Sequence, residues 1–433
     1  MQGVGHLNPV VPLARALQTA GHEVVFACAP SFLSVVEALG FHALPAGFDW
    51  QQLPAESRSA KFDWQQLPQT DRMPSGFDWQ WQRETSNSQQ VHSSDQRAND
   101  SFTSEASLHV EDAGAPPMGL PVLAGQYVEK VFPDLLALVK QWQPDVIVRG
   151  SMDFAAYLVA DACNIPHATA GNGLIMPRSM LKMMVGEPLA AARNRYGLSP
   201  DPDLVGLDHY LYLCMTPPDY QYPDTNVPTL HFIRPTVEDN VYHQDQLPAW
   251  LDSLPDRPTI YITMGTTFNR APALFTTILE GLRYEALNLI VTVGQTQDPQ
   301  RFGPQPPNVY IERYIPMTLL LPRCEAVICH GGANTVMTTL SYGLPIFLTP
   351  IAADQPFHAQ RCADLGVGLT LLAAYLKPDA VRSSVRKLLD EAHFRQTAQR
   401  LQREIEAMPG PEYAVELLAQ LARERRPLLS NGA

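Results

Sequence analysis

The segment CHGGANTV, residues 329 to 336, places residue types that bind anions at the end of an apolar run. Its two adjacent glycines let the main chain approach a ligand closely, and a helix is expected to begin just after them. The first amides of a helix have no partners within it and lie at the positive end of its dipole, so they bind phosphate. We expect Asn334 or Thr335 to cap this helix, and His330 to add a charge-assisted contact. The pattern predicts a phosphate site, although a purely structural turn would use the same glycines.

Three other polar groups follow apolar runs in the same half of the chain. Each run is predicted to be a strand, and open α/β sheets bind ligands at the carboxyl ends of their strands. We therefore expect the three groups to lie beside the glycine turn and to complete one ligand site. They are Gly265 with Thr266, Tyr314 with Ile315, and Asp354 with Gln355.

Near the N-terminus, His6 precedes a predicted helix that is capped by Asn8 and extends from Pro9 to Leu17. An imidazole titrates near neutral pH, so it can take the proton from a hydroxyl that attacks an electrophile. A histidine that packs against the helix or caps it is the alternative. His22, which follows the helix, is expected to be structural.

These residues need a scaffold that brings them together, and the chain predicts one. Apolar runs of strand length alternate with helical stretches between residues 21 and 171 and again between residues 259 and 350. Such alternation favours parallel sheets with helices on both faces. We predict a first domain at 1–215, a proline-rich linker at 216–239, a second domain at 240–410 and a C-terminal helix at 411–433.

One segment, about residues 54–109, fits neither series because it is rich in polar residues and poor in aliphatic ones. It cannot bury enough apolar surface to offset its ordering entropy, so we expect it to be mobile. The motif FDWQ occurs at residues 48–51 and again at 62–65 and 77–80. Local duplication in a tolerant surface loop is one interpretation of the repeats. A lid that offers their tryptophans to an apolar ligand is the other.

Charge and composition exclude several classes of protein. The formal charge is -13 and no block of Lys and Arg occurs, so nothing indicates a nucleic-acid or anionic-membrane partner. No apolar run reaches the ~18 residues of a membrane span, and the N-terminus lacks a signal-peptide pattern. The six cysteines form no C-x-x-C pair and several lie in apolar runs, which indicates buried thiols and neither disulfides nor zinc ligands. We expect a cytoplasmic protein without integral membrane contact.

The segments above resemble the family-one GT-B glycosyltransferases, which transfer sugars from nucleotide diphosphates to natural products. The resemblance extends over nearly the whole chain and is most specific between Arg313 and Leu371, where HGGANTVMTTLSYGLPIFLTPIAADQ looks like the family's donor signature. Together with YITMGTT, this signature is most similar to the bacterial antibiotic and enediyne branch. The resemblance implies an α/β fold of the GT-B class, in which two Rossmann-like, doubly wound parallel-sheet domains face a cleft.

The same resemblance implies a role for each candidate residue. His6 matches the family's general base, and Tyr314 would stack on the nucleotide base where many relatives carry tryptophan. Asp354 and Gln355 would hold the sugar hydroxyls. The rest of the donor site would be formed by Gly265, Thr266, Ile315 and the diphosphate ligands His330, Gly332, Asn334 and Thr335.

Two departures from the family pattern concern the first domain. Relatives begin with a short apolar strand before the histidine loop, where this chain offers only Val4. The simplest hypothesis is that Met1 lies inside a longer natural chain, because a sheet that lacks an inner strand loses backbone partners. In addition, the base usually leans on an aspartate that follows the strand, but Gly150 stands there and Asp153 is the nearest substitute. The alternative role for Asp153 is to cap a helix.

A third departure concerns the donor. Relatives that use UDP often carry a glutamate for the ribose diol at the position of Thr338. A hydroxyl accepts hydrogen bonds less strongly than a carboxylate does, so a dTDP-sugar becomes as plausible as UDP-glucose.

We predict an inverting O-glycosyltransferase that moves a sugar from UDP-glucose or a dTDP-sugar to a hydroxyl of a hydrophobic small molecule, such as a polyketide or a phenol. The nucleotide sugar is a co-substrate, and we expect that no metal ion is required. The acceptor pocket is expected to include residues 172–186, whose methionines suit an adaptable apolar ligand. The main alternative is a nucleotide-sugar-binding homologue with weak or no transferase activity. Further alternatives are a transferase that uses lipid-linked sugar and a sugar-nucleotide epimerase.

Overall fold

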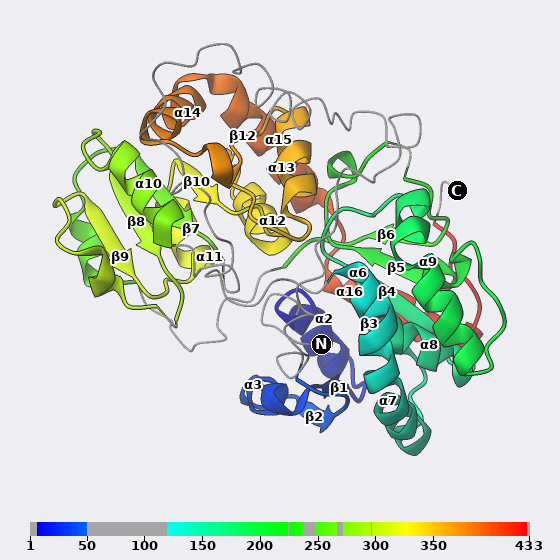
Figure 1. Ribbon diagram of the computed structural model, residues 1–433. Helices are drawn as coiled ribbons and strands as arrows, with labels where there is room; N and C mark the ends of the chain where they lie inside the picture. The colour runs from blue at the N-terminus through cyan, green and yellow to red at the C-terminus, as the bar shows by residue number, and fades with distance from the viewer. Residues whose placement is uncertain are drawn as a thin grey trace, which may run out of the picture.

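The computed structural model describes residues 7–49, 119–223, 225–236, 247–265, 272–295 and 297–430. The predicted base His6, the predicted donor residue Thr266 and the polar insert at 54–109 lie outside these residues. Strands and helices alternate through two successive halves of the chain, which Figure 1 shows as a blue-to-green half and a yellow-to-orange half.

The strands of the first half form two parallel sheets. β1 pairs with β2, and the other sheet has the order β3-β4-β5-β6. Within the described residues, neither β1 nor β2 pairs with that second sheet. The strands are β1 (Val25–Cys28), β2 (His42–Pro45), β3 (Ile147–Gly150), β4 (His167–Gly171), β5 (Leu211–Cys214) and β6 (Leu230–Phe232).

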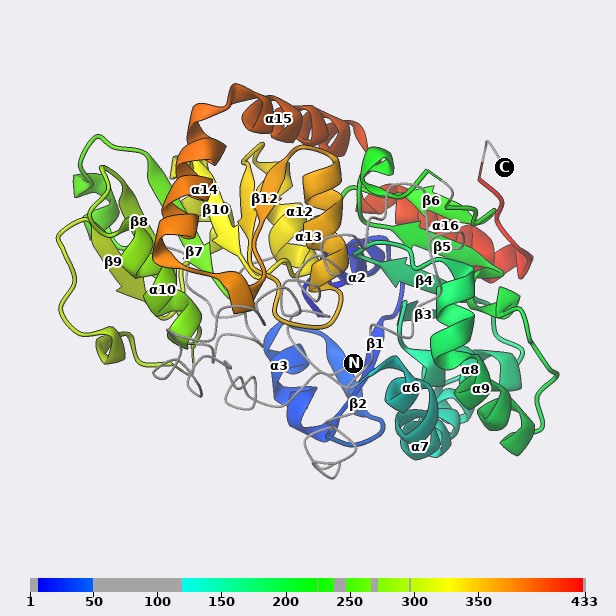
Figure 2. The same ribbon diagram turned by 45° about the horizontal axis from the view of Figure 1, so that its top comes forward.

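Helices cover both faces of the β3–β6 sheet. One face lies under α7, α8 and α9, and the other packs against α2 and the C-terminal helix α16 (Pro411–Glu424). Figure 2 shows α16, in red, along this sheet, so the end of the chain returns to the first half. The remaining helices here are α2 (Val11–Thr19), α3 (Leu33–Ala38), α6 (Leu120–Val122), the π-helical turn η6 (Leu123–Tyr127), α7 (Val128–Trp142), α8 (Phe154–Ala162) and α9 (Arg178–Arg195).

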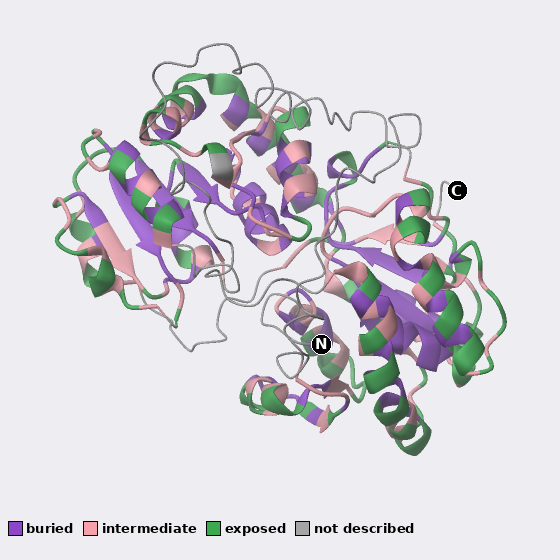
Figure 3. Cartoon of the chain, in the orientation of Figure 1, coloured by how far each residue is buried: buried purple, intermediate pink, exposed green. Residues whose placement is uncertain are grey.

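The second half contains one sheet of parallel strands in the order β12-β11-β10-β7-β8-β9. Its inner strands are almost wholly buried, as Figure 3 shows in purple, because both faces lie under helices. The strands are β7 (Thr259–Thr263), β8 (Asn288–Thr292), β9 (Val309–Glu312), β10 (Ala326–Cys329), β11 (Ile346–Leu348) and β12 (Gly368–Thr370).

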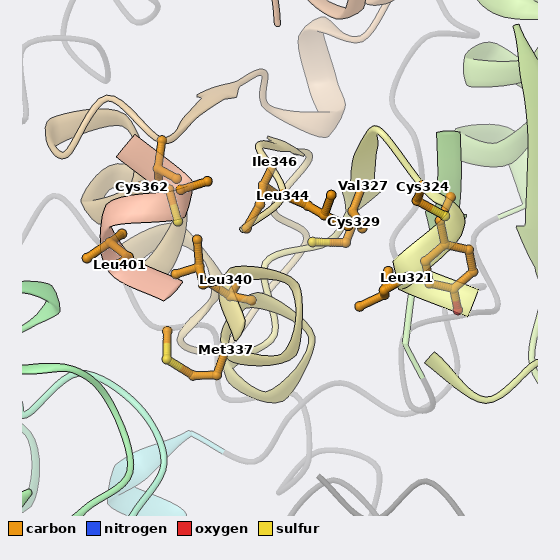
Figure 4. Packing of buried hydrophobic residues seen from close by; sticks show 14 of the residues in the cluster. Leu321, Cys324, Val327, Cys329, Met337, Leu340, Leu344, Ile346, Cys362 and Leu401 are labelled. Atoms are coloured by element: carbon orange, nitrogen blue, oxygen red, sulfur yellow. The ribbon is translucent and has the colours of Figure 1, made fainter. Parts of the chain in front are cut away.

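Alternate residues of these strands enter two separate cores. Ile260 and Ile262 face α10 and α14, whereas Tyr261 between them faces α12, α13 and α15. Figure 4 shows the second of these cores, with Cys329 and Ile346 from the strands and Met337 and Leu340 from α12. The helices are α10 (Pro272–Leu282), α11 (Met317–Leu320), α12 (Ala333–Ser341), α13 (Gln355–Asp364), α14 (Pro378–Asp390) and α15 (Ala392–Ala407).

Two details differ from the sequence prediction. Helix α2 begins at Val11 and not at Pro9, because a helix that began at Pro9 would place the ring of Pro12 against the carbonyl of Asn8. The segment predicted as a linker, 216–239, contains β6, which pairs with β5 of the first half. The prediction of buried thiols is confirmed, since all six cysteines are free and five of them are buried. No helix among the described residues is long and apolar enough to cross a membrane.

Candidate functional site

The predicted phosphate turn lies where the strand order of the second sheet reverses. From β7 the chain continues to β8 and β9 on one side and then returns to place β10 on the other side. In the β7–β10 pair, Thr263 lies opposite Cys329, so the turns after these two strands are neighbours. Open α/β sheets bind ligands in the crevice at such a point.

Three of the candidate residues meet in this crevice. A Cβ atom added to Gly265 would lie 2.6 Å from Cε1 of His330, and one added to Gly332 would lie 2.6 Å from Nε2 of the same ring. Gly265 also has a φ of 70°, which side chains rarely adopt. The imidazole is thus held between two glycines from different loops, and neither position has room for a side chain.

The charge expected on His330 is not present in this arrangement. The ring is 7% exposed, and burial lowers its pKa to about 4. Asp354 raises the pKa, but by less than burial lowers it. Near pH 7 the ring is neutral, so it can offer a neutral N–H to a ligand instead of the predicted charge-assisted contact.

Helix α12 starts without a side-chain cap. Its N-cap residue is Gly332, so the prediction that Asn334 or Thr335 caps the helix was wrong. Thr335 is buried within the helix, and Oδ1 of Asn334 accepts a hydrogen bond of 2.7 Å from Nδ2 of Asn172. Because no side chain caps the first turn by a hydrogen bond, the positive end of the helix is directed at the glycine turn.

Asp354 and Gln355 lie at the start of α13, after β11. The side chain of Asp354 is 60% exposed, and its Oδ2 is 3.5 Å from Nε2 of His358. Gln355 is 1% exposed, and its Oε1 accepts the N–H groups of Ile351 and Ala352 at 2.8 and 3.0 Å. Gln355 therefore braces the loop before α13, and its NH₂ group is the part suited to a ligand.

Tyr314 and Ile315 follow β9, on the opposite side of β7 from β10. Tyr314 is half-buried, whereas Ile315 is completely buried in the core beneath α12. The side chain of Ile315 belongs to that core, and a contact with a ligand would have to use its main chain.

A polar network that the sequence did not predict joins this site to the segment between β5 and β6. The phenol oxygen of Tyr220 is 2.9 Å from Nδ1 of His358. On the next turn of α13, Arg361 donates to the carbonyls of Asp219, Tyr220 and Gln221 at 2.7 to 2.9 Å. The only sequence signal was a histidine and an arginine at helical spacing after Gln355, which cannot show partners so distant in the chain.

Asp153 occupies the N-cap position of α8, where its Oδ1 accepts the N–H of Ala156 at 3.2 Å. The capping role is therefore observed. Its predicted partner, His6, lies outside the described residues. A Cβ added to Gly150 would meet no atom within 4 Å, so this glycine leaves open space beside Asp153.

A cavity of about 310 Å³ lies in the first half, on the face of the sheet opposite α16. Neighbouring strands supply Arg149, Thr169 and Tyr212 to its wall. The loop after β4, residues 172–177, continues from this cavity to the second half. In this β4 loop, a Cβ on Gly173 would lie 3.1 Å from Nε2 of His358, and Leu174 lines the cavity. The cavity and the phosphate turn are therefore connected by one short loop.

Comparison with known proteins identifies the family of this chain. The sequence profile of the Erythromycin biosynthesis protein CIII-like family matches this chain with both of its domains, the N-terminal domain at residues 75–265 and the C-terminal domain at residues 279–421. Together the two matches cover well over half of the chain. The chain belongs to the natural-product family-one GT-B glycosyltransferases.

Individual relatives agree with this assignment. The glycosyltransferase is 28% identical to 4'-demethylrebeccamycin synthase of Lentzea aerocolonigenes, over 97% of each chain. It is 26% identical to 10-deoxymethynolide desosaminyltransferase of Streptomyces venezuelae, over 97% of this chain and 95% of that one. Among solved structures, Spinosyn Forosaminyltransferase SpnP has a TM-score of 0.70 at 24% identity, with 98% of this chain and 97% of that chain covered. The predicted α/β GT-B fold and the predicted enzyme class are confirmed.

Proposed function

We propose that this glycosyltransferase is an inverting O-glycosyltransferase with a dTDP-sugar donor and a hydrophobic, hydroxylated acceptor. The observation that carries the proposal is the uncapped start of α12, with His330 held between Gly265 and Gly332 at the strand-order reversal. A diphosphate there would meet helix amides and an imidazole N–H. These groups stabilise the negative charge that grows on the leaving group, which is the part of the reaction that most needs stabilisation.

The reaction we propose is a single displacement. The acceptor oxygen attacks the anomeric carbon, the bond from that carbon to the diphosphate oxygen breaks, and the acceptor proton passes to His6. Attack from the side opposite the leaving group inverts the anomeric centre. Because helix amides and His330 can stabilise the diphosphate, we propose that transfer needs no metal ion and that the nucleotide sugar is the only co-substrate.

Two observations support dTDP over UDP as the carrier. Thr338 stands where UDP-using relatives often carry a glutamate, and its side chain is buried, so it is poorly suited to accept from a ribose diol. The related structure of the glycosyltransferase VinC contains dTDP, and that of Spinosyn Rhamnosyltransferase SpnG contains thymidine diphosphate. The relatives named for macrolide and rebeccamycin products support a natural-product acceptor, and free cysteines support a cytoplasmic location.

Mass spectrometry of reactions with dTDP-glucose or UDP-glucose and a panel of hydroxylated polyketides and phenols tests the proposal. We expect a glycosylated product with dTDP-glucose, unchanged yield in EDTA, and loss of product in His6→Ala with dTDP binding retained. A His6→Ala variant that keeps the wild-type rate would exclude His6 as the base. Nucleotide binding without product from any acceptor would favour the alternative of a binding protein with little activity.

A further inference from the structure

The residues that line the cavity in the first half include a buried cation. Arg149 is 2% exposed, and its Nη1 donates to the carbonyls of Gly150 and Ser151 at 3.1 and 3.2 Å. Its Nη2 donates to the carbonyl of Leu207 at 2.5 Å. No ion pair among the described residues includes Arg149, so its hydrogen-bond partners there are all uncharged.

Two of the five N–H donors of this guanidinium remain unused. The buried Nε has no hydrogen-bond partner in the described part of the chain, and Nη2 has one further N–H beyond the bond to Leu207. Nε is closed off from the cavity, so a carboxylate bound there would have to reach the guanidinium through the second N–H of Nη2. A buried N–H without a partner is costly, so a ligand that supplies an acceptor to Nη2 is favoured.

The charge of Arg149 is only partly compensated. Burial lowers its pKa, although the negative charges of Asp208 and Asp153 act in the opposite direction. Asp208 also lines the cavity, but it forms an ion pair with Arg178, which lines the cavity too. The ionic side chains of the cavity wall therefore sum to one positive charge, in a chain whose formal charge is -13.

Much of the rest of the wall is apolar. Leu174, Met176, Leu181 and Leu207 line the cavity together with Tyr212, whose pKa burial raises, so that its phenol is neutral. The β4 loop joins this wall to α12 and α13, which carry the proposed donor site. The cavity volume is at the lower end of the range for small-molecule sites.

We propose that this cavity receives the acceptor and that Arg149 selects acceptors with a carboxylate on an otherwise apolar, hydroxylated skeleton. The inference rests on the proposed function, and it adds the acidic group as the feature that distinguishes good acceptors from poor ones. A positive charge that is already buried loses little further hydration when the carboxylate arrives, so the paired state is favoured.

The test compares para-coumarate with its methyl ester, which has the same ring and hydroxyl but no negative charge. Binding of each to the dTDP-saturated enzyme is measured by titration calorimetry for wild type, Arg149→Met and Arg149→Lys. We expect wild type to bind the acid about tenfold more tightly than the ester, Arg149→Met to lose this preference while its ester affinity stays within about twofold, and Arg149→Lys to keep part of it. Arg195→Met is the matched control, because Arg195 is exposed on α9 and pairs with Glu129.

The melting temperature and dTDP affinity of each variant show whether it is folded. If Arg149→Met does not fold, the inference is tested by the acid-to-ester affinity ratios of the wild type and of Arg149→Lys. Equal binding of acid and ester by wild type overturns the inference, and so does a folded Arg149→Met that still prefers the acid. In both cases the proposed function stands if the wild type binds dTDP and transfers sugar. If the wild type does neither, the proposed function is overturned whatever the acid-to-ester ratio.

Discussion

At the residue scale, Asp153 has one observed role and one predicted role, and one pair of substitutions can separate them. As the N-cap of α8 it needs only a side-chain oxygen, which asparagine also provides, whereas support of an imidazolium on His6 needs a negative charge. We expect Asp153→Asn to keep the wild-type melting temperature and to lower kcat at least tenfold. Asp153→Ala should lower kcat similarly and also destabilise the fold by about 1 kcal/mol.

Steady-state kinetics and thermal unfolding of the two variants provide the measurement. A wild-type kcat in Asp153→Asn would leave capping as the only role of this carboxylate. In that case the hydrogen bond that Asp153 accepts from the N–H of Ala156 would account for its role.

Single residues differed in how well the sequence predicted them. The glycines around His330 were predictable, because only glycine fits where two loops approach one ring. Ile315 was assigned to the donor site from its neighbour Tyr314, yet its side chain is a core residue, and sequence position alone could not separate the two. Arg149 was not predicted as a site residue, because its burial depends on carbonyl partners such as that of Leu207, which is 58 residues away in the chain.

At the scale of elements, Arg361 holds the segment between β5 and β6 against α13 through hydrogen bonds. Its guanidinium donates to three successive carbonyls around the short helix Pro218–Tyr220, and its charge lies over the ring of Tyr222. Arg361→Met would leave the buried carbonyls of Tyr220 and Gln221 without these donors, so we expect a loss of about 2 to 4 kcal/mol in the free energy of unfolding. Denaturant unfolding measures the loss.

Arg426→Met is the control for this prediction, since Arg426 is an exposed arginine that pairs with Glu424 near the C-terminus. Its effect should stay within about 0.5 kcal/mol. Equal stabilities for the two variants would mean that water replaces the Arg361 donors at no cost and that α13 does not hold the segment in place.

Strands β7 to β11 of the second half were predictable, because they are largely apolar runs soon followed by glycine or proline, whereas β12 (Gly368–Thr370) was not predicted. Ala326–Cys329 and Ile346–Leu348 are buried on both faces, and such runs have few alternatives to an inner parallel strand. The strand Leu230–Phe232 was missed within the predicted linker, because it is short, follows a proline-rich stretch and becomes a strand only by pairing with β5. Helix α2 begins two residues later than predicted, because Pro12 does not allow a helix that begins at Pro9.

At the scale of the whole molecule, several connections among the described residues join the half that we propose binds the donor to the half that we propose binds the acceptor. Helix α16 crosses back to the first sheet, Arg361 holds the segment between β5 and β6, and Asn334 of α12 bonds to Asn172 of the β4 loop. The last connection is the most direct, because it joins the helix that we propose to bind the diphosphate with the loop that leads to the cavity. The sequence predicted two halves of the right class, but these contacts depend on residues that are far apart in the chain.

The position of the diphosphate on α12 is the central claim, and calorimetric titration of dTDP into Gly332→Ala tests it most directly. The added Cβ would press against the His330 ring and occupy the space that a phosphate needs, although the φ of Gly332, -64°, suits alanine. Gly186→Ala on α9 is the control, because a Cβ there meets no atom within 4 Å. We predict at least tenfold weaker dTDP binding in Gly332→Ala and wild-type binding in Gly186→Ala. A folded Gly332→Ala that binds dTDP within about twofold of wild type would contradict the account.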